Sequence, residues 1–113
     1  MRTIEVAERD WAHTLDEFSA LHQGSSVSVD VMVPDMGLFP RIRHLPLRSV
    51  TSETTVRGPE ITISASDGDG EHMIHIISEP THVRLERTIG GDDVELEIES
   101  SEGTTAIIRF DNA

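Results

Sequence analysis

The sequence changes its hydrophobic period once, near Gly24, and this change limits the fold more than any other feature. Before Gly24, large side chains recur at the three- and four-residue spacing of one helix face. They are Trp11, Leu15, Phe18 and then Leu21 or His22. After Gly24, apolar residues alternate with polar ones, as in strands with one buried and one wet face. The pattern predicts a single helix within residues 8–23, followed by strands.

The strands are separated by clear turn signals. Gly, Pro, Asp and Ser cluster at residues 34–37, 67–70, 90–92 and 101–103. The segment 38–45 contains Pro40, which favours a place at a sheet edge. We predict a loop at residues 54–59. We therefore predict a single α+β domain over residues 1–113. Its N-terminal amphipathic helix packs on an antiparallel meander sheet of about six or seven strands.

The last turn allows two registers. A two-residue loop would place the apolar residues of the final strand on the same face as the preceding glutamates. A three-residue loop instead pairs Leu96 with Ile108 on the core face and sets Glu95 opposite Arg109. Gly103 then takes the left-handed position of a bulge that is usual in such hairpins. We prefer the three-residue loop.

Charge excludes some classes of partner. The chain has 21 Asp and Glu against 9 Arg and no Lys, for a formal net charge of −12. Phosphate backbones require clustered cationic side chains, and anionic membranes would be repelled, so we expect neither nucleic acid nor membrane as a partner. Cations and basic partners are compatible with the charge. A high-salt cytoplasm or a GC-rich genome, which encodes Arg in place of Lys, would each explain the missing Lys.

The absence of Cys excludes disulfides, thiolate metal sites and cysteine nucleophiles. No apolar stretch is long enough to span a membrane, and the charged N-terminus lacks the apolar run of a signal peptide. These features predict a soluble, cytoplasmic protein.

Four groups of residues resemble a bacterial domain-of-unknown-function family of short single-domain proteins. They are residues 4–18 with Trp11 and Phe18, then Leu45-Pro46-Leu47 with Val50-Thr51, then residues 71–75 with Pro80, and finally Leu96-Glu97-Ile98, Gly103-Thr104 and Ile108-Arg109-Phe110. The resemblance covers nearly the whole chain and implies a single small domain. It implies no activity, ligand or catalytic residue.

Three histidines are the main candidate ligands. His72, His75 and His82 lie near a predicted turn, and imidazoles with nearby carboxylates bind Zn²⁺ and similar ions. However, His72 and His75 are an odd number of residues apart, so a regular strand points them to opposite faces. The favoured interpretation is one half-buried and one exposed histidine.

A second, weaker metal candidate is the Asp-Gly-Asp-Gly-Glu run, in which Asp67, Asp69 and Glu71 alternate as at the start of a calcium loop. The later ligands of such a loop are missing, because Ser78 stands where the bidentate Glu is needed. We favour a hairpin turn here, since Asp and Gly adopt the backbone conformations that turns require.

We predict no catalytic residue and no cofactor. No Gly-x-Ser-x-Gly elbow or phosphate-binding glycine loop occurs, and Asp16 and Glu17 lie opposite the apolar stripe of the helix. The favoured function is therefore a non-enzymatic domain that contacts an unknown protein partner or a second copy of itself. Leu38, Phe39 and Ile42 mark a candidate edge strand for that contact. The alternative is a metal- or small-ligand-binding protein that uses the histidines of residues 72–82.

Overall fold

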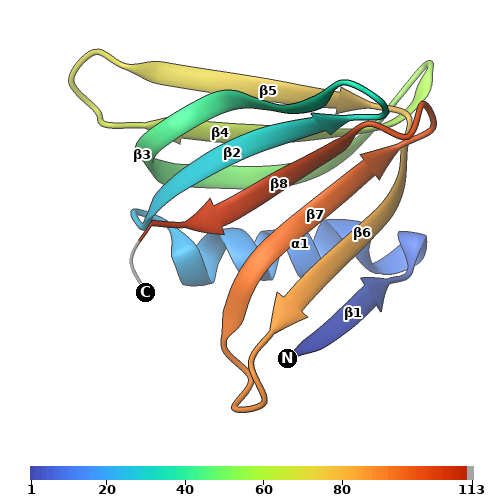
Figure 1. Ribbon diagram of the computed structural model, residues 1–113, viewed down its shortest axis with the longest axis horizontal. Coiled ribbons are helices and arrows are strands. Elements are labelled where there is room, and N and C mark those ends of the chain that lie inside the picture. The colour runs from blue at the N-terminus through green and yellow to red at the C-terminus, as the bar shows by residue number, and fades with distance from the viewer. Residues whose placement is uncertain (112–113) are drawn as a thin grey trace.

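The computed structural model describes residues 1–111 and contains one antiparallel sheet with a helix on its concave side (Figure 1). The elements are β1 (Arg2–Val6), the 3-10 turn η1 (Glu8–Asp10), α1 (Trp11–His22), β2 (Ser26–Val33), β3 (Gly37–Thr55), β4 (Gly58–Ser66), β5 (His72–Ser78), β6 (Pro80–Arg87), β7 (Asp93–Ser100) and β8 (Thr105–Phe110). The single N-terminal helix and the antiparallel sheet agree with the predicted α+β class.

Within residues 1–111 the sheet has eight strands, so the expected six or seven was too low. The strand that the sequence did not reveal is β1, whose two apolar residues, Ile4 and Val6, are too few to define a period. The predicted strand 38–45 is the first part of a longer strand, β3, which continues to Thr55. The expected loop at 54–59 is reduced to a turn at residues 56–57.

The strand order is β1-β6-β7-β8-β2-β3-β4-β5. Consecutive strands are neighbours within β2–β5 and within β6–β8, as in the predicted meander. The two groups join where β8 pairs with β2, and β1 adds to the outer side of β6. The chain therefore crosses from one end of the sheet to the other between β5 and β6, at Glu79, which has a positive φ of 52°.

The long strand β3 changes partners at its middle. Residues 37–46 pair with β2, and pairing with β4 begins at Leu47 beside an irregularity in the ladder. In the second half of β3, the edge that does not pair with β4 is covered by α1 and the residues after it. Gly24 N–H donates to the Leu47 carbonyl oxygen at 2.8 Å, and Leu47 N–H donates to the Ser25 carbonyl oxygen at 2.8 Å. Covering an edge in this way prevents pairing with another chain.

Ser19 of α1 continues this cover along β3. Its hydroxyl oxygen accepts the Val50 N–H at 2.8 Å and lies 2.9 Å from the Val50 carbonyl oxygen and 2.8 Å from that of Leu15. Each of these carbonyl groups is an acceptor for the Ser19 hydroxyl proton. The hydroxyl thus ties the helix to the strand edge.

Ser19→Ala is therefore expected to lower the free energy of unfolding by about 1–2 kcal/mol, because polar groups of Val50 lose their protein partner. Urea unfolding followed by Trp11 fluorescence measures the effect. Alanine has the higher helix propensity, so propensity alone would change stability in the opposite direction. Ser19→Thr keeps the hydroxyl and is the control, and a Ser19→Ala variant as stable as the wild type would refute the role given to this hydroxyl.

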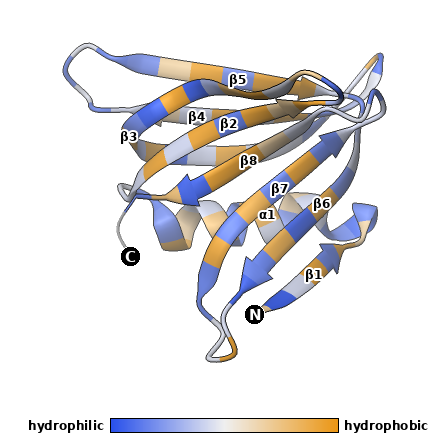
Figure 2. Ribbon diagram, in the orientation of Figure 1, coloured by the Kyte–Doolittle hydropathy of each residue, from blue (hydrophilic) through white to orange (hydrophobic). Residues whose placement is uncertain are grey.

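The helix buries the predicted stripe. Trp11, Leu15 and Phe18 are buried in the core between α1 and the inner face of the sheet, and Trp11 Nε1–H donates to the Val6 carbonyl oxygen at 3.0 Å. The last position of the stripe belongs to His22, since Leu21 is 73 % exposed. Figure 2 shows the alternation of apolar and polar residues along β6 and β7 that supplies the opposite wall of this core.

The final hairpin has the predicted three-residue register. Leu96 pairs with Ile108, Glu95 lies opposite Arg109, and Gly103 has a φ of 85°. The Arg109 guanidinium lies 3.3 Å from a Glu95 carboxylate oxygen. Burial of one face therefore decided the register, as expected.

Candidate functional site

The three candidate histidines lie in different surroundings. His72 is on the outer face of β5, with Nε2 3.2 Å from the Ser64 hydroxyl oxygen. His82 is on β6, with Nδ1 3.2 Å from a Glu5 carboxylate oxygen. His75 is half-buried on the inner side of β5. No group of three or more His, Cys, Asp or Glu within residues 1–111 is arranged to hold a metal ion.

The Asp-Gly-Asp-Gly-Glu run forms the turn between β4 and β5. A carboxylate oxygen of Asp67 accepts the backbone N–H groups of Asp69 at 2.9 Å, Gly70 at 3.1 Å and Glu71 at 3.1 Å. These hydrogen bonds, led by that from Asp69, lower the pKa of Asp67. The Asp67 side chain thus stabilises its own turn.

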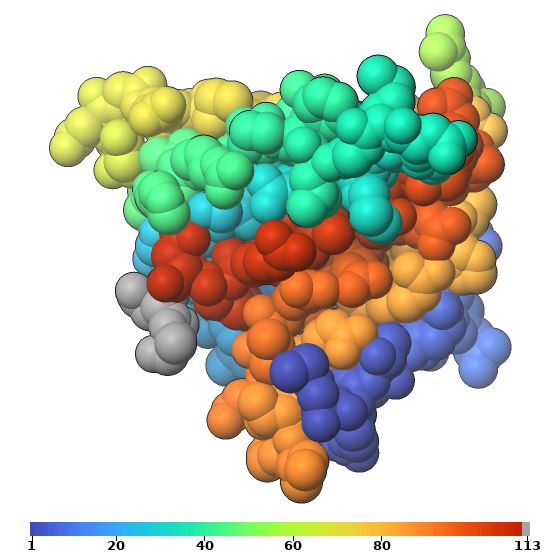
Figure 3. Space-filling view, viewed as in Figure 1, coloured from blue at the N-terminus to red at the C-terminus, as the bar shows by residue number. Residues whose placement is uncertain are grey.

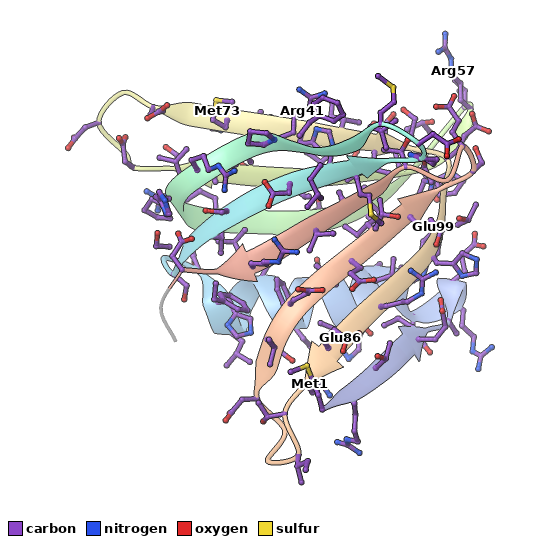
Figure 4. All side chains as sticks on the ribbon, in the orientation of Figure 1. Met1, Arg41, Arg57, Met73, Glu86 and Glu99 are labelled. Atoms are coloured by element: carbon purple, nitrogen blue, oxygen red, sulfur yellow. The ribbon has the colours of Figure 1, made fainter. Side chains whose placement is uncertain are left out.

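A cavity of about 310 Å³ lies between β5 and the ends of β2, β3 and the β7–β8 turn, and we call it the seam cavity. It is lined by Val31, Val33, Arg41, His75, Ile76, Ile77, Ser78, Glu79, Ser100, Ser101, Glu102, Thr104 and Ala106. Figure 4 labels Arg41 on β3 and Met73 on β5, both on the upper side of the molecule. The cavity exists because β3 bends: its first half, residues 37–46, pairs with β2 alone among the described residues.

The seam cavity has charge at both of its ends. Burial and, secondarily, the Arg41 charge lower the pKa of His75, so this histidine and Arg41 share one end. Glu79 follows the last residue of β5, and its carbonyl oxygen accepts the Ser101 N–H at 2.9 Å, next to Glu102. Since a strand rises about 3.3 Å per residue, roughly 13 Å of chain separates His75 from Glu79.

The outer face of β3, β4 and β5 carries no charge over two cross-strand rows. The rows are Thr51–Thr62–Ile76 and Ser49–Ser64–Ile74, and we call these six residues the uncharged face. Ile74 and Ile76 are 55 % and 52 % exposed. The first row beyond this face contains Glu53 opposite Glu60, so charge returns at its border.

The convex side of the rest of the sheet is instead strongly acidic, and the front of the molecule in Figure 3 displays the strands that carry it. Glu95, Glu97 and Glu99 project from β7 in a row, as predicted, and the Arg84 guanidinium contacts Glu99 and Glu97. A hydrogen bond with Glu95, partial burial and the charges of Glu95 and Glu86 raise the pKa of Glu97 to about 7. Glu97 is therefore partly protonated near neutral pH.

The predicted interaction edge is only partly present. Leu38 and Phe39 are exposed on the first half of β3, but Ile42 is 2 % exposed and belongs to the core. Ile42 turns inward because the ladder is irregular next to Val29, its partner on β2. The exposed apolar side chains that lie beside an uncharged surface are those of β5.

The fold is that of a small α+β domain, and the comparison with known families is consistent with this description. Residues 2–113 match the model of a family of unknown function, DUF5335, and the chain belongs to that family. No curated protein and no solved structure matches the chain. Among the described residues, no helix has the length and apolar character needed to cross a membrane.

Proposed function

We propose that this protein is a non-enzymatic interaction domain that forms a reversible homodimer through the uncharged face. The observation that carries the proposal is the exposure of Ile74 and Ile76 on a surface without charge, in a chain whose net charge is −12. Exposed apolar side chains surrounded by polar ones are typical of contact surfaces.

Electrostatics favours this face over the others. Two copies of a strongly acidic chain repel each other, and the repulsion is smallest where the approaching surfaces carry no carboxylate. β5 contains no charged residue and no proline, so the strand that carries Ile74 and Ile76 adds no charge to this face, whereas β1 contains Arg2 and Glu5.

The composition of the uncharged face also fits sheet-on-sheet packing. β-branched side chains form flat surfaces, and two such sheets pack about 10 Å apart. In a two-fold arrangement each isoleucine contacts the partner's copy of the same surface. Three strands offer less area than the roughly 800 Å² per partner of a standard interface, so we expect weak association.

Sedimentation equilibrium up to millimolar concentration tests the proposal. The wild-type mass is expected to rise from monomer toward dimer, and more so in high salt, which screens the repulsion. The double variant Ile74→Lys/Ile76→Lys is expected to remain monomeric. Ile89→Lys makes the same chemical change at a side chain that is 86 % exposed in the β6–β7 turn, and it should associate like the wild type. A monomeric wild type, or equal association by the double variant, would refute the proposal.

A cytoplasmic location and adaptation to high salt belong to the same proposal. The absence of Cys suits a reducing compartment, in which disulfides do not persist. Excess carboxylate keeps a surface hydrated, and high salt would reduce the repulsion between two copies.

A further inference from the structure

We propose that the seam cavity binds a small linear zwitterion, with its carboxylate at Arg41 and its ammonium group at Glu79 and Glu102. Ile76 lines the cavity and also belongs to the uncharged face, but Arg41, His75, Glu79 and Glu102 do not belong to that face. The charged groups on which the inference depends are therefore separate from the surface proposed for self-association.

Part of the cavity wall is apolar. Val31 and Val33 of β2, Ile77 of β5 and Ala106 of β8 contribute side chains to its wall. Its volume of about 310 Å³ lies at the lower end of the range for small-molecule sites. A short chain of methylene groups suits such a wall, because burial of apolar groups is favourable.

Arg41 supplies the cationic end. Within residues 1–111 Arg43, Arg84, Arg87 and Arg109 each pair with at least one carboxylate. Arg41, like Arg2, Arg9, Arg48 and Arg57, makes no ion pair there, and it is the member of this unpaired group that lines the cavity. An unpaired guanidinium beside a cavity is a ready partner for a carboxylate, which it binds in a bidentate manner. The half-buried His75 beside it adds an imidazole that donates or accepts one hydrogen bond.

Two glutamates supply the anionic end. Glu79 is held in place by the hydrogen bond from Ser101 N–H to its carbonyl oxygen, and Glu102 lies in a turn closed by Gly103 N–H and the Ser100 carbonyl oxygen at 2.9 Å. Ser78, Ser100, Ser101 and Thr104 line the same cavity and carry hydroxyl groups. This combination of carboxylates and hydroxyl acceptors fits a primary ammonium group.

The charge of the whole protein decides between ligand classes. A net charge of −12 repels an anion at long range, although Arg41 would accept it locally. A simple cation gains nothing from Arg41 and has many other carboxylates available to it. A zwitterion carries no net charge, so it meets no long-range repulsion and satisfies both ends.

Titration of ¹⁵N-labelled protein with linear amino carboxylates, from β-alanine through γ-aminobutyrate and δ-aminovalerate to ε-aminocaproate, tests the inference. We expect amide shifts at the cavity residues and an affinity that depends on chain length, because the two charged ends lie a fixed distance apart. Caproate and hexylamine each lack one charged group and should bind at least tenfold more weakly than the best zwitterion. Equal binding by either one, or no shift at the cavity with any member of the series, would overturn the proposal.

Substitutions identify the two ends. Arg41→Gln should weaken the best zwitterion at least tenfold and leave hexylamine unaffected, and Glu79→Gln should weaken the zwitterion and leave caproate unaffected. Arg9→Gln, at an exposed side chain of η1 outside the cavity, is the matched control and should bind like the wild type. Both cavity substitutions are at exposed side chains, so they should not disturb folding. Unchanged binding in Arg41→Gln would contradict the assignment.

Discussion

Phe18→Ala is expected to lower the free energy of unfolding by about 3–5 kcal/mol, the usual cost of deleting a buried aromatic side chain. Phe18 is 3 % exposed and anchors α1 to the sheet. Its ring centroid lies 5.9 Å from that of Phe110 on β8 and 4.7 Å from that of His22. Alanine would leave a cavity between the helix and β8, because the rigid strands around it cannot collapse to fill the space.

Urea unfolding of the wild type and the variant, followed by circular dichroism, measures this loss. Leu21→Ala is the matched control, since Leu21 lies one turn further along the same helix with its side chain largely exposed. We expect the control to change stability by less than about 0.5 kcal/mol. Similar losses in both variants would show that the helix does not bury the face described.

Glu97→Gln is expected to stabilise the protein above pH 7, by about 1–2 kcal/mol once solvent screening of this partly exposed group is allowed for, and to leave stability unchanged near pH 4. The folded-state pKa of Glu97 is about 7, against 4.5 for the ordinary side chain, because of Glu95, burial and Glu86. Between these two values the folded chain binds more protons at this site than the unfolded chain. The contribution of this site to the free energy of unfolding is therefore fully present below pH 4.5 and is lost as the pH rises through 7. Glutamine does not ionise, so the variant does not undergo this loss.

The difference in unfolding free energy between the two proteins, measured from about pH 4 to pH 9, isolates this site from the other carboxylates. Glu99→Gln is the control on the same row, and there the loss of the hydrogen bond from Arg84 predicts no gain at any pH. A Glu97→Gln difference that does not grow with pH, or one that Glu99→Gln reproduces, would contradict the shared proton between Glu95 and Glu97.

The elements with a long or unambiguous pattern were predictable from the sequence. Trp11, Leu15 and Phe18 define a helix face over two turns, and burial of that face needs no knowledge of the partner strands. The β7–β8 register was also predictable, because a shift by one residue would have exposed the whole apolar set beside Glu95. Local periodicity and the cost of exposing apolar surface were sufficient in both cases.

The bend in β3 was not predictable, and most of the candidate site depends on it. Pro46 and the irregularity at Leu47 are local signals, but the exchange of β2 for β4 as partner is a property of the whole sheet. The seam cavity therefore has no sequence signature, and Arg41 became a candidate only when it was placed beside His75. The pKa of Glu97 likewise depends on the positions of Glu95 and Glu86 around it.

The histidine hypothesis shows how alternation limits such predictions. His72 and His75 are close in sequence, but the strand turns them to opposite faces, as their odd spacing indicated. His82 lies beyond Glu79, where the chain leaves β5 for the other end of the sheet. Only His75 reaches the seam cavity. The uncharged face had a visible signal, because residues 72–78 contain no charge in a chain that is 27 % charged.

Isotope-filtered NOE spectroscopy on a mixture of labelled and unlabelled protein tests self-association most directly. At millimolar concentration we predict intermolecular contacts from the methyl groups of Ile74 and Ile76, and none from that of the equally exposed Leu38. The Ile74→Lys/Ile76→Lys variant should show no intermolecular contact. Intermolecular contacts centred on Leu38, or none from either isoleucine in the wild type, would contradict the assignment of the uncharged face as the surface through which this protein acts.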